Sequence, residues 1–73
     1  MANKAYIIKP PGELWWIQEA IIPVKVVGFI GDSLTVRVNF RNGKHKSFQY
    51  QRQDIGHTIF ETREAAESAL LGV

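Results

Sequence analysis

Cysteine is absent from this 73-residue chain, so neither a disulfide nor a thiolate-bound zinc ion can stabilise its fold. The longest apolar runs are far shorter than the ~20 residues needed to span a bilayer, and no secretory signal is visible. We therefore expect a cytoplasmic protein that does not enter a membrane. A chain of this length predicts one domain, residues 1–73, with a thin hydrophobic core.

Groups that carry catalysis are also scarce. The chain has no Cys nucleophile, no Gly-rich phosphate loop and no closely spaced pair of carboxylates on a strand. Asp54 and His57 could meet across a turn, but an Asp at such a position more often accepts hydrogen bonds from local backbone N–H groups. His45 and His57 lack obvious further ligands for a metal ion. We expect no enzymatic activity, no catalytic residue, no metal and no cofactor.

Acidic residues are missing from one long segment. Residues 33–53 carry five cations and no Asp or Glu, whereas residues 54–73 carry one Arg against four acids, a net charge of −3. The charge of the chain is therefore polarised along its sequence. The five cations are Arg37, Arg41, Lys44, Lys46 and Arg52.

Three β-rich runs occupy the centre of the chain, at residues 22–30, 34–40 and 44–50. In the middle run, apolar residues from Leu34 to Phe40 alternate with polar ones, which is the period of a half-buried strand.

The turns between these runs set the strand register. A three-residue turn at 41–43 pairs Val36 with Phe48 and collects six apolar residues of eight on one face. Lys46 then lies opposite Val38, so it must reach a rim or be turned out by a bulge.

The turn between the first two runs also sets a register. A three-residue turn at 31–33 pairs Ile30 with Leu34, whereas a two-residue turn would bury Lys25 at a high free-energy cost. We expect the three-residue turn. The other face of the first run then carries three apolar residues that need a cover or form a binding patch, namely Ile21, Val27 and Phe29.

The segment before these runs is ambiguous. Residues 1–4 are expected to be frayed and residues 6–8 to form a short strand that ends at the Pro10–Gly12 stretch. Residues 14–17 have strand-like composition but helical spacing; we favour a strand that continues past a bend at Pro23. One tryptophan of the Trp15–Trp16 pair is then expected to fill the core and the other to cover Phe29 or the barrel end, in preference to an exposed aromatic anchor.

The C-terminal third predicts a polar turn with one 3₁₀ turn at 51–56, a short strand at 57–60, and a helix over 62–71. Thr62 is the expected N-cap and Gly72 the expected stop. So short a helix must dock on the sheet to be stable. Its apolar stripe comprises Ala66, Ala69, Leu70 and Val73.

Residues 54–70, DIGHTIFETREAAESAL, resemble the ending D-x-G-x-T-x-F-x-T-R-E-E-A-E-x-A-L of small uncharacterised proteins of Firmicutes, their phages and mobile elements. The resemblance extends over roughly residues 14–71, with Ala65 in place of the usual Glu. It implies a mainly β fold: a small SH3-like antiparallel barrel, or a strongly bent sheet, with strands within 14–60 and a C-terminal helix that closes it. It implies no catalytic residues.

The basic hairpin is the principal functional candidate, because cations and hydrogen-bonding side chains on one sheet face suit anionic partners. The leading hypothesis is a non-enzymatic protein-interaction module, an accessory factor of a phage or mobile element, that binds a protein with an acidic surface. The alternative is weak, sequence-tolerant nucleic-acid binding through residues 37–52; a solvated face without a partner is also open. The expected partner-binding residues are Arg37, Asn39, Arg41, Lys44, His45 and Arg52. An alternative aromatic patch comprises Trp15, Trp16 and Phe29.

Overall fold

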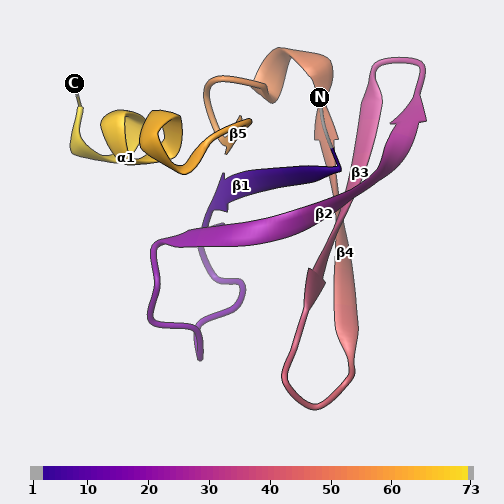
Figure 1. Ribbon diagram of the computed structural model, residues 1–73, viewed down its shortest axis with the longest axis vertical. Helices are drawn as coiled ribbons and strands as arrows, with labels where there is room; N and C mark the ends of the chain where they lie inside the picture. The colour runs from indigo at the N-terminus through magenta and orange to yellow at the C-terminus, as the bar shows by residue number, and fades with distance from the viewer. Residues whose placement is uncertain (1–2, 73) are drawn as a thin grey trace.

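The β-rich segments form one antiparallel sheet in the order β4-β3-β2-β1-β5 (Figure 1). The structure, a computed structural model, describes residues 3–72. The sheet is open, because the edge strands β4 and β5 do not pair with each other in this part of the chain. The mainly β fold with a C-terminal helix is confirmed, whereas the closed barrel is not found: the last strand has only two residues. The elements are β1 (Lys4–Ile8), β2 (Ile21–Ile30), β3 (Ser33–Asn39), β4 (His45–Gln51), η1 (Arg52–Asp54), β5 (Ile59–Phe60) and α1 (Arg63–Leu71).

The β3–β4 hairpin has the predicted register. Val36 lies opposite Phe48, and the Phe40 N–H donates to the Lys44 carbonyl oxygen at 2.8 Å. Gly43 has a φ of 82°, the left-handed conformation that closes a three-residue turn.

Lys46 lies opposite Val38, as predicted. No bulge turns it out; its side chain reaches the rim, where Nζ pairs with the Glu13 carboxylate. The first of the two expected solutions for this lysine is therefore the one adopted.

The β2–β3 turn differs from the prediction. Ile30 lies opposite Ser33, so the turn has two residues rather than three. A β-bulge at Val27 then shifts the register, and Lys25 stays on the exposed face. A two-residue turn alone would bury Lys25 at a high free-energy cost. The bulge avoids this cost, because one extra residue moves every side chain beyond it to the other face.

One hydrophobic core lies on the concave face of the sheet, which we call the inner face. Phe48 and Tyr50 of β4 pack against it. Burial, followed by the Asp54 carboxylate, raises the pKa of Tyr50 above its ordinary value. The buried members are Ala5, Ile7, Leu14, Ile22, Val24, Leu34, Val36, Val38 and Ile59.

A second, smaller core lies on the opposite face, which we call the outer face. It contains Ile21, Phe60 and Ala66, with Tyr6 and Ile8 packed against it. The sequence predicts one core shared by Val36, Val38, Phe48 and Phe60; this prediction is wrong for Phe60, which lies in the second core. Ile59 belongs to the inner core, and successive strand residues point to opposite faces, so Phe60 points into the outer core.

Helix α1 covers one end of the outer face. It begins after Thr62, whose hydroxyl caps the first turn, and ends at Gly72 with a φ of 78°, as predicted. Ala66 is fully buried but Leu70 is 47% exposed, so the predicted apolar stripe is only partly used. Val73 lies outside the described residues.

The segment that joins β1 to β2, residues 9–20, is neither strand nor helix. The predicted strand over 14–17 is therefore wrong. Pro23 stands inside β2 without a break, because β2 pairs with β3 only from Lys25 onward. Lys4 already belongs to β1, inside the segment expected to be frayed; residues 1–2 are not described.

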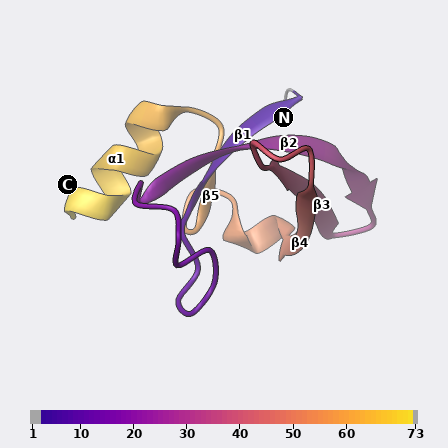
Figure 2. The same cartoon turned by 90° about the horizontal axis from the view of Figure 1, so that it is seen from below.

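The connection from β4 to β5 crosses the open side of the inner face. The predicted 3₁₀ turn is present as η1, and Gly56 has a φ of 90°. The last strand is shorter than expected, since residues 57 and 58 lie in a turn. Figure 2 shows η1 and the 9–20 loop on the same side of the β1 and β2 ribbons.

Candidate functional site

The uncovered part of the outer face carries a row of cations from three neighbouring strands. Lys4 lies opposite Lys25, and Lys25 lies opposite Arg37. Directly opposed residues point to the same face with their Cα atoms about 5 Å apart, so these three side chains are neighbours. We call Lys4, Lys25 and Arg37 the cationic row.

Positive charge continues beyond the row toward α1. The Lys4 Nζ and the Arg63 guanidinium carbon lie 5.8 Å and 5.2 Å from the centroid of the Tyr6 ring. Both distances are in the range of cation–π attraction, which orders the two side chains around Tyr6.

Carboxylates are kept out of the sheet. None of the five strands in residues 3–72 contains an Asp or a Glu. Like charges directly opposite one another destabilise a sheet. The cationic row therefore costs stability in the free protein, and a bound anion would offset that cost.

Arg37 forms the β3 end of the cationic row. Its Nε atom is buried and has no hydrogen-bond partner within residues 3–72. An unsatisfied buried donor costs about 1–3 kcal/mol. The side chain borders a hollow of about 300 Å³ whose lining comprises Asn3, Lys4, Pro23, Val24, Lys25, Arg37 and Asn39.

Five of the six predicted binding residues gather around this face and its end, and Arg52 does not. Asn39 lies opposite His45 on the same face as Arg37. Arg41 and Lys44 flank the β3–β4 turn and are exposed.

Arg52 lies elsewhere, at the opposite end of the hairpin. Its guanidinium carbon is 4.8 Å from the centroid of the Phe29 ring, and its Nε is 3.5 Å from the Asp32 carboxylate. Arg52 is therefore engaged locally and lies apart from the cationic row.

Both tryptophans are exposed, Trp15 by 79% and Trp16 by 52%. The expectation that one of them fills the core is wrong, because Leu14 takes that place and is fully buried. Leu14 has a φ of 52°, a left-handed conformation that costs an L-residue roughly 1–2 kcal/mol. Burial of its side chain holds the 9–20 loop in this conformation and leaves the two indoles in solvent.

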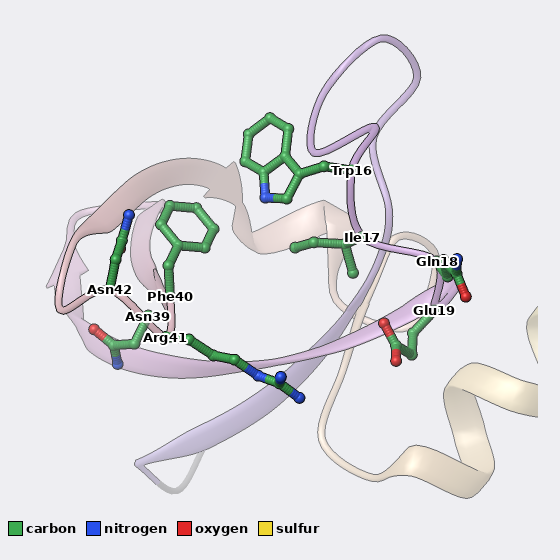
Figure 3. Close-up of a pocket in the computed structure, with 8 residues that line it drawn as sticks. All are labelled: Trp16, Ile17, Gln18, Glu19, Asn39, Phe40, Arg41 and Asn42. Carbon is green, nitrogen blue, oxygen red and sulfur yellow. The ribbon is translucent and has the colours of Figure 1, made fainter.

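A hollow of about 660 Å³ lies between the 9–20 loop and the β3–β4 turn (Figure 3). The rings of Trp16 and Phe40 meet edge to face, with centroids 5.8 Å apart. Figure 3 shows Arg41 extending from the turn toward the side where Glu19 lies. We call this site the aromatic hollow; it is lined by Trp16, Ile17, Gln18, Glu19, Asn39, Phe40, Arg41 and Asn42.

Phe29 does not belong to the same aromatic surface. It lies opposite Leu34, whereas Trp16 contacts Phe40 at the other end of β3. Six residues of extended chain separate those ends by roughly 20 Å. The predicted aromatic patch is therefore split into two sites.

Asp54, His45 and His57, the residues considered for catalysis or metal binding, form no common site. The Asp54 Oδ2 atom accepts a hydrogen bond from the Gln51 N–H at 2.9 Å, the local bond expected for an Asp at this position. His45 and His57 are exposed. No cluster of three or more potential metal ligands occurs within residues 3–72, and no helix in that range is long and apolar enough to cross a membrane.

Comparisons of the chain with protein-family models, curated proteins and solved structures found no match. The two hollows and the cationic row are therefore the features of the molecule that indicate a function.

Lys4 and Lys25 are functional candidates that the sequence prediction did not include. Lys25 was expected to point outward, but the assumed turn placed it opposite Asn39 rather than Arg37. Lys4 was assigned to a frayed end. The available signal was the alternation of Lys4 with the apolar residues Ala5 and Ile7, which is typical of a strand. Ala5 and Ile7 are fully buried in the structure, so Lys4 points to the opposite face.

Proposed function

We propose that the chain is a small, non-enzymatic binding module whose cationic row binds the phosphate backbone of a nucleic acid. The observation that carries the proposal is the register Lys4–Lys25–Arg37 across three strands. Cations at a regular spacing suit a polymer with regularly repeated phosphates. The Arg37 side chain borders the 300 Å³ hollow, and its guanidinium group supports an anionic ligand there, since guanidinium–phosphate hydrogen bonds are among the strong ones.

A protein with an acidic surface is the second candidate, and it was the leading expectation from the sequence. The exposed edge strand β4 favours it, because a partner strand could add to that edge. The resemblance of residues 54–70 supports an SH3-like origin and a role as an accessory factor of a phage or mobile element.

Fluorescence anisotropy with a labelled random-sequence oligonucleotide tests the proposal. Three phosphate contacts give a slope of log affinity against log salt of about −2.1 to −2.7, so raising salt from 50 to 200 mM should weaken binding roughly 20- to 40-fold. Labelled polyglutamate is the parallel probe for an acidic protein.

Arg37→Glu should weaken oligonucleotide binding at least ~10-fold and reduce the salt slope by about 1 or more. Its melting temperature should equal or slightly exceed that of the parent, because Glu at this position replaces the like-charge contact with Lys25 by an attractive one. Arg52→Glu is the matched control: it makes the same change of charge at the far end of the hairpin and should retain affinity within about 3-fold. Binding of polyglutamate but not of the oligonucleotide would favour the second candidate, and no binding of either at 50 mM salt would overturn both.

A further inference from the structure

The aromatic hollow and the cationic row form one continuous surface. Asn39 lines both the 300 Å³ hollow beside Lys25 and Arg37 and the 660 Å³ hollow beside Trp16. Arg41 stands next in the chain after Phe40 and points into the larger hollow (Figure 3). A chain-like ligand that follows the cations can therefore reach the indole of Trp16 without crossing a covered part of the protein.

The lining of the aromatic hollow combines a ring face with hydrogen-bonding side chains. Gln18, Asn39 and Asn42 each offer both donors and acceptors. Glu19 is an acceptor only, and it would repel a phosphate but accept a hydrogen bond from a base N–H such as the N3–H of thymine. This combination fits a nucleobase rather than a phosphate.

The ring geometry determines where a base can lie. A base inserted between two rings needs about 7 Å, two contact distances of ~3.5 Å, whereas the centroids of Trp16 and Phe40 are only 5.8 Å apart. Phe40 instead supports Trp16 from the side. The base must stack on the solvent-exposed face of the Trp16 indole.

The 9–20 loop holds Trp16 in place before any ligand arrives. The Lys9 N–H donates to the Ala20 carbonyl at 2.8 Å, and Lys9 Nζ donates to the Ile17 carbonyl at 2.5 Å. With the buried Leu14, these contacts fix both ends of the segment that carries the tryptophans. A platform ordered in advance reduces the entropy lost on binding.

We infer that the aromatic hollow is a base-stacking site and that the nucleic acid bound by this chain is single-stranded, with its phosphates on the cationic row and a base on Trp16. The inference rests on the proposed function and adds the strandedness of the ligand. A duplex keeps its bases stacked on one another, so it could use the cationic row but not the indole.

Three labelled probes of 15 nucleotides test the inference: oligo(dT), an abasic strand with the same phosphates, and a duplex. Oligo(dT) should bind more tightly than the abasic strand by about 5- to 150-fold, the range for stacking of one base. Trp16→Leu should bring oligo(dT) down to the abasic level and leave abasic binding unchanged. Trp16→Tyr, which keeps an aromatic face, should retain most of the preference.

Trp15→Leu is the comparison variant: Trp15 is more exposed than Trp16, does not line the hollow, and contacts Trp16 edge to face with ring centroids 5.7 Å apart. It should keep the preference for oligo(dT). A melting curve checks that each variant is folded. Equal affinity for oligo(dT) and the abasic strand, tighter binding of the duplex, or an unchanged Trp16→Leu would overturn the stacking site while the Arg37-dependent binding stands. Loss of all oligonucleotide binding in the parent would instead overturn the proposed function.

Discussion

Phe60→Ala should lower the free energy of unfolding by about 3–5 kcal/mol. Phe60 is 3% exposed and is the largest side chain of the outer core, where it contacts the cluster formed with Ile21 and Ala66. So small a domain has a total stability of only about 3–5 kcal/mol, so the variant should be largely unfolded at room temperature. Urea titration followed by circular dichroism measures the change.

Phe29→Ala makes the same chemical change at a ring that is 37% exposed. Its cost should be well below that of Phe60→Ala, since part of the ring is already in water. Equal losses for the two variants, or a Phe60→Ala protein that melts within a degree or two of the parent, would contradict the placement of Phe60 in a core.

The sequence predicted local features whose signals are contained in a few neighbouring residues. The β3–β4 register follows from alternation in one strand plus a Gly that takes a positive φ, and the structure has the same pairing of Val36 with Phe48. The helix bounds follow from Thr62 and Gly72 for the same reason: a cap is set by the residue and its immediate neighbours.

Features that depend on distant contacts were missed. The bulge at Val27 has only a weak local signal, the Gly28 that follows it inside the strand. Without the bulge, the two-residue turn is excluded by the cost of burying Lys25. The division of the apolar residues into two cores was also not predictable. The face to which Phe60 points depends on how β5 pairs with β1. Phe60 lies opposite Tyr6, so it shares the outer face with Tyr6 and α1.

The candidate site shows the same limit. The basic residues of the hairpin were recognised, but the row that they complete needs Lys4 and Lys25 from two other strands. The tryptophans were expected to be at least partly buried, because large aromatics usually dominate small cores. The buried Leu14, with its left-handed backbone, reverses that expectation.

The outer face therefore has two parts, one apolar and one cationic. One end is covered by α1 and is apolar, and the remainder is open and cationic. Tyr6 lies at the boundary, since it packs against the outer core while Lys4 and Arg63 lie over its ring. Correct docking of α1 thus positions one end of the cationic row.

Ala66→Asp should detach α1 and destabilise the protein by about 3 kcal/mol or more, because it places an unpaired carboxylate where the native side chain is fully buried. Ala65→Asp is the matched control. Ala65 is exposed and lies in the first turn of the helix, where its N–H donates to the Thr62 hydroxyl at 3.1 Å, so a negative charge there should change stability by no more than about 0.5 kcal/mol, in the favourable direction.

The pH dependence separates charge from steric effects in Ala66→Asp. Burial would raise the pKa of the new carboxyl in the folded state above its unfolded value of about 3.9. The electrostatic part of the loss is therefore complete above the folded pKa, shrinks as pH falls below it, and vanishes below about 3.9, where both states are protonated. Thermal melts of both variants and the parent between pH 7 and pH 3.5 measure this convergence. Equal melting temperatures of Ala65→Asp and Ala66→Asp at pH 7 would show that α1 does not dock through Ala66.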